Sequence, residues 1–290
     1  MTRARAGAIV SDCALALAFF LLLVIAPGTA RGQGAAAARD AGVAVGAQYD
    51  STHVYVASAD LGAFVKSVNA TFGGQASKVS VTNVLPVPSS TEFQYVWTPV
   101  GTMSVFAFQT PVPFPFRLER TGYLVTDMDA AIREARAAGA EVIVEPFKDP
   151  IGRDAVIQWP GGVKMQLYWH FTAPKYPPLD TIPDNRVYVS RDAADKFVEA
   201  FLRFAHGKVL ADDVRADASE MGRAGETYRR IRISSQFGNM QVLVTDGHLP
   251  YPFGHEITGY EVRDLGATIE KAKASGGSFC RRVTRRTTEG

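Results

Sequence analysis

Apolar and polar residues alternate with two different periods between Thr121 and His170. A period of two predicts strands at both ends of this segment, and a period near 3.6 predicts a helix between them. Asp127 stands where the N-cap of the helix is expected, and Gly139 where the helix should stop. One face of the helix would carry the apolar residues Met128, Ala131, Ile132 and Ala135. The segment therefore predicts a strand, a helix and three further strands.

The same pattern occurs again from Thr258 as TGYEVRDLGATIEKAKASGG, at an offset of 137 residues from Thr121. A second pair of segments, beginning at His53 and Arg186, shares the run Val-Tyr-Val at an offset of 133 residues. A repeated strand-helix-strand-strand-strand module predicts a fold in which modules pair and leave a cleft between them. We therefore expect four modules in two pairs.

The domain boundary is expected in a proline-rich segment, residues 173–185, which has no apolar period and joins the second module to the third. The first domain would then span residues 49–172 and the second residues 186–290. Residues 31–48 are rich in small side chains and are expected to form a flexible lead-in.

Residues 1–30 have the layout of a secretory signal peptide. Arg3 and Arg5 precede an apolar run over residues 13–26, and small residues follow up to Ala30. The run is shorter than the about 20 residues that a membrane span needs. We expect cleavage near Ala30, export to a periplasm or the medium, and no stable membrane insertion afterwards. An uncleaved membrane anchor is the alternative.

Composition and motifs exclude several classes of function. The formal net charge of the 290 residues is only +2, and no basic stripe is interleaved with aromatic residues, so nucleic acid is not an expected partner. Cleavage would leave Cys280 as the single cysteine, so no intrachain disulfide is expected. The sequence contains no GxGxxG loop, no GxSxG elbow and no cysteine pair with zinc spacing. Asp149, Asp154 and Asp213 are interpreted as loop or strand-edge acids that take part in turns.

The second module, with its helix IREARAAGAEV and its strand KMQLYWH, resembles the glyoxalase, bleomycin-resistance and extradiol-dioxygenase superfamily, also called vicinal oxygen chelate proteins. The resemblance extends over nearly everything after about residue 48. It implies an α+β fold of paired βαβββ modules, in which open, U-shaped sheets surround a small-molecule site that usually holds a divalent metal. It does not imply one reaction, because this fold hosts lyases, dioxygenases, epimerases and metal-free binding proteins.

The resemblance also implies where metal ligands would stand, on the first and last strands of each module. The corresponding positions of the first domain are His53, Val105, Arg120 and Gln166. Only His53 is a ligand of the expected kind. At 4 Å and an effective dielectric constant of about 20, two unit charges repel by about 4 kcal/mol, and a divalent ion doubles this value, so Arg120 opposes an ion. We therefore expect no metal cofactor.

Strand alternation predicts which side chains face the first cleft. His53 and Tyr55 share one face of their strand, and Gln166 and Tyr168 share one face of theirs. Any ligand is expected to place an anionic or carbonyl oxygen near Arg120. A half-buried, structural histidine is an equal alternative for His53. The predicted ligand-binding residues of the first domain are His53, Tyr55, Tyr95, Trp97, Arg120, Gln166 and Tyr168.

The second domain departs further from a metal site. The resemblance places Arg186, Val242 and Ile257 at the positions that correspond to His53, Val105 and Arg120 of the first domain. Arg230 and Arg232 alternate with isoleucines that belong to the core face, and together with Arg186 they would form a cationic cleft suited to a carboxylate or a phosphate. A solvated outer strand is the alternative.

The fourth module is expected to be incomplete. By the offset of 137 residues, Gly290 corresponds to Arg153, so the last two strands of this module have no counterpart. The second domain should then be less stable than the first, and residues after about Gly276 should be poorly ordered or paired with another chain in a homo-oligomer.

These observations favour an exported protein that binds a small molecule in a sheet cleft without the usual metal. The first alternative is a lyase or dioxygenase that depends on a divalent metal and uses His53 with Glu119 or Glu92. The second alternative is a non-catalytic assembly protein with the incomplete fourth module as its edge. Whether any reaction is catalysed stays open at this point.

Overall fold

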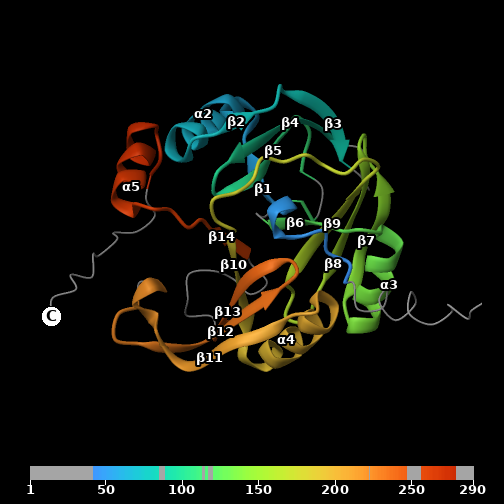
Figure 1. The fold of residues 1–290 in the computed structure, drawn as a ribbon, viewed down its shortest axis with the longest axis vertical. Helices are drawn as coiled ribbons and strands as arrows, with labels where there is room; N and C mark the ends of the chain where they lie inside the picture. Colours follow the sequence, from blue (N-terminus) through green and yellow to red (C-terminus); the bar gives the residue numbers. More distant parts are fainter. Residues whose placement is uncertain are drawn as a thin grey trace, which may run out of the picture. The chain divides into compact units, whose positions relative to one another are not determined.

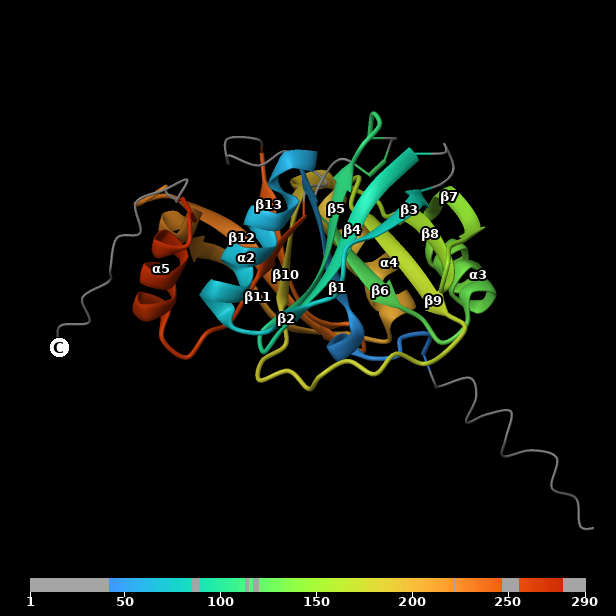
Figure 2. The same ribbon diagram turned by 90° about the horizontal axis from the view of Figure 1, so that it is seen from above.

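The structure is a computed structural model, and it describes residues 42–84, 89–112, 115–116, 120–221, 223–246 and 256–278. Two β-sheets run through these residues, with helices packed against their faces (Figure 1; Figure 2). The predicted signal peptide, residues 1–30, lies outside the described part of the chain. Among the described helices, none has the length and hydropathy that a membrane span requires.

The first two modules form the larger sheet, whose strand order is β2-β4-β5-β1-β6-β9-β8-β7, with β3 paired to β4. β1 and β6 pair antiparallel and join the two modules, whereas β1 with β5 and β6 with β9 pair in parallel. The elements are η1 (Ala47–Tyr49), β1 (Ser51–Val56), η2 (Ser58–Asp60), α2 (Leu61–Phe72), β2 (Gln75–Ala76), β3 (Ser80–Val84), β4 (Ser89–Thr98), β5 (Gly101–Phe108), β6 (Arg120–Leu124), α3 (Met128–Ala138), β7 (Glu141–Lys148), β8 (Gly152–Gln158) and β9 (Lys164–His170).

The third and fourth modules form the second sheet, whose strand order is β11-β12-β13-β10-β14. Its elements are β10 (Asp184–Ser190), α4 (Arg191–Ala205), β11 (Lys208–Asp217), η3 (Ala218–Met221), β12 (Thr227–Ser235), β13 (Gly238–Thr245), β14 (Glu256–Gly259) and α5 (Leu265–Ala274). The predicted α+β fold of paired βαβββ modules is confirmed. The sequence also predicts that the last two strands of the fourth module are missing. This prediction concerns residues after Ser278, which lie outside the described part of the chain.

The helix predicted from the repeat forms as expected. The Asp127 side chain accepts a hydrogen bond from the backbone N–H of Ala130 at 2.7 Å and caps α3. Gly139 ends the helix in the left-handed conformation with φ 100°, which a residue without a Cβ adopts at low cost. In the second copy, the Asp264 side chain accepts from the N–H of Ala267 at 2.9 Å and caps α5.

We call the helix-covered face of each sheet its back face and the opposite face its front face. The back faces of the two sheets share one apolar core, in which α3 packs beside α4 (Figure 1). Phe201 and Phe204 of α4 are buried there, and the Trp159 ring lies 6.1 Å and 5.3 Å from theirs. Both pairs of modules therefore bury apolar surface in a common core.

Two matching sets of hydrogen bonds also join the back faces. Thr121 of β6 donates to the Asn185 side chain at 3.0 Å, and Asn185 donates to the Tyr123 hydroxyl at 2.8 Å. In the other set, Thr52 donates to Thr258 at 3.1 Å and accepts from the Tyr260 hydroxyl at 2.7 Å. The Thr-Gly-Tyr run of each repeat therefore bonds to the first strand of the opposite sheet.

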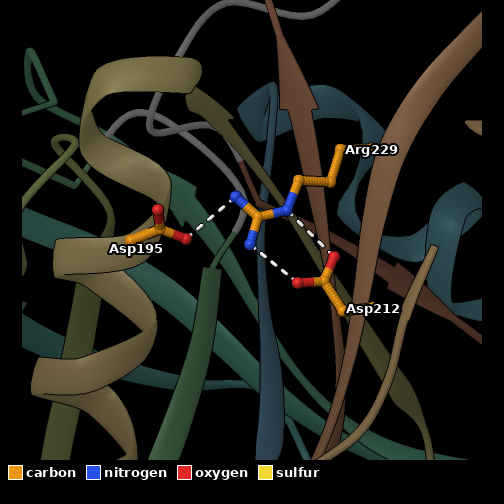
Figure 3. A network of polar contacts seen from close by, with 3 residues as sticks. All are labelled: Asp195, Asp212 and Arg229. Atoms are coloured by element: carbon orange, nitrogen blue, oxygen red, sulfur yellow. Dashed lines mark hydrogen bonds and ion pairs between the residues drawn. The ribbon is translucent and has the colours of Figure 1, made fainter. Parts of the chain in front are cut away.

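An ion-pair network holds α4 against the edge of the second sheet (Figure 3). Arg229 of β12 bonds both carboxylate oxygens of Asp212 in β11, at 2.9 Å and 2.7 Å, and approaches Asp195 of α4 at 2.8 Å. The bidentate geometry fixes the guanidinium direction. Because the side chains of Asp195 and Asp212 are 77% and 38% exposed, we interpret this network as an orienting contact with a small contribution to stability.

Candidate functional site

The front face of the first sheet carries a row of side chains from four neighbouring strands. Tyr95 of β4 lies opposite Ser104 of β5, and Ser104 lies opposite His53 of β1. His53 in turn lies opposite Arg120 of β6. Residues opposite one another in a ladder share a face, so the predicted common face of His53 and Arg120 is confirmed.

His53 occupies the middle of this row and is 5% exposed. Its Nδ1 lies 3.1 Å from the Gln166 side-chain oxygen. Its Nε2 lies against the backbone of Gly122, where an added Cβ would stand only 2.5 Å from that nitrogen. Burial, helped by the nearby Arg120 charge, lowers the pKa of His53 to about 3. His53 is therefore a neutral imidazole, with Nδ1 hydrogen-bonded to Gln166 and Nε2 close to Gly122.

Arg120, which belongs to this row, and Tyr55 share the front face with His53. Arg120 is 2% exposed, donates to the backbone carbonyl of Pro115 and places its guanidinium 5.4 Å from the centre of the Phe116 ring. The Tyr55 ring stacks at 5.5 Å from that of Phe106. Burial raises the pKa of Tyr55 to about 12, although the Arg120 charge acts in the opposite direction. Neither side chain lines the cavity in front of them.

That cavity has a volume of about 340 Å³, the size of a small-ligand site. Aromatic side chains form much of its wall, and the rings of Phe93 and Tyr95 meet edge to face at 4.6 Å. Phe93 also lies 5.0 Å from Phe106. The polar groups come from several strands. The residues used below are Ser51, His53, Phe93, Tyr95, Ser104, Phe106, Asp149, Asp154, Tyr168 and His170.

Two carboxyl groups line the cavity, and no lysine or arginine is among the lining residues that the structure describes. Asp154 of β8 lies opposite Tyr168 of β9 and is only partly exposed. Burial, and then the neighbouring Asp149, raise the pKa of Asp154 well above its usual value. His170 lies at the same end, and burial lowers its pKa while Asp149 opposes this change. The acidic side chains of the described lining are therefore not balanced by a lysine or an arginine within that lining.

The two acids differ in what their carboxylates do. Asp149 accepts hydrogen bonds from the backbone N–H groups of Ile151, at 2.9 Å, and Gly152, so its predicted turn role is confirmed. Asp154 lies inside strand β8, and the turn role predicted for it is wrong. A period of two over residues 153–157 would have predicted that Asp154 lies on the front face, because the neighbouring Ala155 is buried on the back face.

A second, more open hollow adjoins the cavity and shares Tyr95, Pro150, Ile151 and His170 with it. Trp97 lies in this hollow, stacked 5.6 Å from Tyr95. The segment after β9 closes one side, and its Tyr176 ring lies 6.3 Å from that of Trp97 and 6.4 Å from that of Tyr95.

The predicted residues of the first domain thus occupy three places. His53, Tyr95 and Tyr168 line the main cavity, and Trp97 lines the adjoining hollow. The predicted residues that share the front face without lining the cavity are Tyr55, Arg120 and Gln166. The expectation of a ligand oxygen beside Arg120 therefore has no support from the cavity lining.

The resemblance places Val105 at the metal-ligand position on the last strand of the first module, and this prediction is wrong by one residue. Val105 is fully buried on the back face with Leu61 and Val96, and Ser104 stands beside His53 instead. The same correction applies to the second sheet, because Val242 belongs to the back-face core and Gln241 lies opposite Arg186. A single slip of one residue moves a side chain to the opposite face of a strand.

The arginines of the second sheet stand on its front face. Arg186 and Arg232 lie on either side of Gln241, in strands β10, β12 and β13. Arg230 shares their face, whereas Ile231 and Ile233 are buried in the core, so the predicted alternation is confirmed. Arg232 is exposed, and Arg186 and Arg230 are partly exposed. None of the three arginines lines the cavity of the first sheet.

The front-face residues do not fit the divalent metal that the fold implies. His53 has Nδ1 hydrogen-bonded to Gln166, Ser104 offers a neutral hydroxyl, and the Arg120 guanidinium lies in the same row. Glu92 is in register with the buried Ala107 and belongs to the back face, so it cannot join His53. Glu119 lies outside the described residues. Within the described part of the chain, no three His, Cys, Asp or Glu side chains are grouped to hold an ion.

Comparison with known proteins supports the fold. No family model matches the sequence, and neither does any curated protein. Among solved structures, a triple mutant of 4-hydroxymandelate synthase from Streptomyces coelicolor is similar, with a TM-score of 0.55 and 13% identity over 81% of this chain and 75% of that chain. A xylose isomerase-like TIM barrel/4-hydroxyphenylpyruvate dioxygenase fusion protein reaches a TM-score of 0.47 and 14% identity, over 81% of this chain and 39% of that chain. The likeness to the synthase concerns the fold, and it agrees with the fold that the resemblance of the sequence implies.

Proposed function

We propose that the protein binds a small organic molecule with a flat apolar body and a positively charged group, in the cavity of the first sheet and without a divalent metal. The observation that carries this proposal is Asp154, a poorly solvated carboxyl group in an aromatic cavity whose described lining has no lysine or arginine. A ligand cation would supply the missing positive charge.

The magnitudes support a cationic ligand over an anionic one. Burial disfavours the charged form of Asp154, and a cation at about 4 Å offsets this by up to about 4 kcal/mol at an effective dielectric constant of 20. A cation over the face of an aromatic ring gains a further attraction of about 0.5–2 kcal/mol. An anionic ligand would instead meet the charge of Asp149 or Asp154 without a described partner in the lining.

A matched pair of probes tests the sign of the ligand charge. Tryptamine and 3-(indol-3-yl)propanoate share an indole ring on a two-carbon chain, and they differ in whether the chain ends in an ammonium or a carboxylate. We expect calorimetric titration to give at least about tenfold tighter binding of tryptamine, which equals about 1.4 kcal/mol. Equal binding, or tighter binding of the propanoate, would overturn the proposal.

Two substitutions separate the parts of the site. Asp154→Asn keeps the shape but removes the charge, so it should abolish the preference for tryptamine. Tyr95→Leu should weaken both probes, because it removes an aromatic wall. Asp60→Asn, at an exposed position of η2, is the matched control and should change neither affinity. Tryptamine binding should strengthen as pH rises through the raised pKa of Asp154, since the free carboxyl then ionises.

The alternative is a metal-dependent lyase or dioxygenase, which the fold of the synthase favours coarsely. Elemental analysis after dialysis separates the two functions. We expect less than about one tenth of an equivalent of zinc, iron, manganese or nickel, because the row holds too few donors. A near-stoichiometric ion that His53→Ala removes would establish the alternative.

We also propose that the protein is exported, on the evidence of the apolar run over residues 13–26 behind Arg3 and Arg5. Expression of the full chain in a Gram-negative host, followed by N-terminal sequencing of the protein in the periplasm, tests this proposal. A mature N-terminus near Arg31 is expected. An intact N-terminus at Met1 in the membrane fraction would establish the uncleaved anchor.

A further inference from the structure

The junction between the back faces of the two sheets contains a buried carboxyl group without an obvious counter-charge. Asp50, just before β1, is 9% exposed, and its Oδ1 has no hydrogen-bond partner. A second buried carboxyl group, Glu256 of β14, is 4% exposed and accepts a hydrogen bond from the backbone N–H of Thr121 at 3.2 Å. The two groups are close enough for each charge to affect the other.

A small void lies beside Asp50. Its volume is about 10 Å³, which is room for a single water molecule or ion. Besides Asp50, three oxygen-bearing side chains line it, those of Thr52, Thr121 and Asn185. Apolar groups, including Phe237, form the rest of the wall. The described lining therefore combines one carboxylate with neutral oxygen ligands and contains no cationic side chain.

We propose that this void is a site for one hard metal cation, Ca²⁺ or Na⁺, held by Asp50 with the oxygens of Thr52, Thr121 and Asn185. Oxygen atoms are the preferred ligands of such ions. A cation supplies positive charge to Asp50, whereas a water molecule supplies only hydrogen bonds. Mg²⁺ fits less well, because it requires near-ideal octahedral geometry and gives up its water molecules reluctantly, whereas the coordination geometry of Ca²⁺ is flexible.

The electrostatic environment of Asp50 agrees with this assignment. Burial and the charge of Glu256 raise the pKa of Asp50, although a backbone hydrogen bond from Leu124 acts in the opposite direction.

The site would also link the two sheets. Asp50 and Thr52 belong to the segment around β1, Thr121 belongs to β6, and Asn185 belongs to β10 of the second sheet. A cation held by these four residues would add a connection beside the hydrogen bonds that already join Thr121 to Asn185. It lies on the back face and is therefore distinct from the cavity of the proposed function.

The test uses the full chain, stripped with a chelator and exchanged into a potassium buffer. Thermal unfolding is followed while CaCl₂, NaCl or MgCl₂ is added at constant ionic strength. We expect a saturable rise in unfolding temperature with Ca²⁺ or Na⁺ and a much smaller rise with Mg²⁺. Equilibrium dialysis with Ca²⁺ should give about one equivalent where Ca²⁺ is the ion that stabilises.

Three variants make the test specific. Asp50→Asn should lose the ion response, and Asp60→Asn, at an exposed position, should keep it. Thr52→Val, which removes one oxygen, should need at least about tenfold more ion for half the response. If Asp50→Asn fails to fold, Thr52→Val and the dialysis decide the question.

Two results would overturn the cation site. One is an absence of any ion response in the native protein, which would mean that the void holds only water. The other is an ion response that Asp50→Asn and Thr52→Val retain. His53→Ala should leave the ion response unchanged. If this variant lost the ion response, the ion would bind in the cavity of the first sheet instead.

Discussion

Helices α3 and α5 come from the two copies of one sequence repeat, yet they occupy different environments. Each follows a Thr-Gly-Tyr strand and begins at an aspartate N-cap. Helix α3 buries one face against α4 and the first sheet, whereas α5 buries no residue fully and contacts α2 (Figure 1). Leu265, at the position of the buried Met128, is 59% exposed.

The difference follows from what each helix meets. The face of α3 that carries Ala131 and Ala135 packs where the two sheets share their core. Helix α5 meets α2 at its end, where the Ser275 hydroxyl lies 3.3 Å from the hydroxyls of Ser67 and Thr71. A cap and an apolar face are therefore enough for a helix to form, but its contribution to stability depends on its partner.

Hydrogen exchange should show the largest difference between the copies. The amides of Ala135 and Ala272 occupy equivalent positions, and their rates are compared after correction for the different preceding residues, Glu134 and Lys271. We expect Ala135 to exchange at least about 100-fold more slowly, because opening α3 disrupts the common core and opening α5 does not. Equal protection at the two positions would show that α5 is held by contacts beyond those described.

Removing equivalent isoleucines should separate the copies by a few kcal/mol. Ile132→Ala leaves a cavity in the core and should cost about 2–5 kcal/mol in the free energy of unfolding. Ile269→Ala, at a half-buried position, should cost less than about 1.5 kcal/mol. Urea unfolding of both variants measures the difference. Equal losses would mean that the two helices are equally well packed in solution.

The matching tyrosines test the hydrogen bonds between the back faces. Tyr123→Phe leaves the buried Asn185 amide without its acceptor and should cost about 1–3 kcal/mol. Tyr260→Phe removes a donor to the hydroxyl of Thr52 in a partly buried place and should cost about 0.5–1.5 kcal/mol. Urea unfolding with a double-mutant cycle against Asn185→Ala and Thr52→Val checks each pair. Additive losses in both cycles would show that the bridges carry no stability.

Loss of the N-caps should give the smallest effect and the most similar one in the two copies. Asp127→Ala and Asp264→Ala each remove one capping hydrogen bond, with an expected local cost of about 1 kcal/mol. The loss at α3 should appear in global unfolding. The loss at α5 should appear mainly as faster amide exchange of that helix, measured by NMR, so an equal global loss would contradict the proposed difference in coupling.

The comparison of the two repeats therefore distinguishes the local structure that the sequence of one strand-helix unit determines from the stability that the packing around the unit contributes. The N-caps Asp127 and Asp264, the stop at Gly139 and the front and back faces of β9 and β12 were predictable from the sequence. Each of these depends on interactions within a few residues or on a period of two or 3.6. The prediction of Val105 was wrong by one residue. With a period of two, an error of one residue in the alignment of a strand places the side chain on the opposite face, and Ser104 is the residue beside His53.

The sequence by itself determined the fold class, the four modules, and the common face of His53 and Arg120. Only the tertiary structure decided which residues of that face meet the cavity: it covers Arg120 and Tyr55, and it exposes Asp154 to an aromatic wall. The tertiary structure alone also brings Asp50 near Glu256, which stands more than 200 positions later in the chain. Strand periodicity assigns a side chain to a face, but strand order and the packing of one sheet on another set its depth and its neighbours.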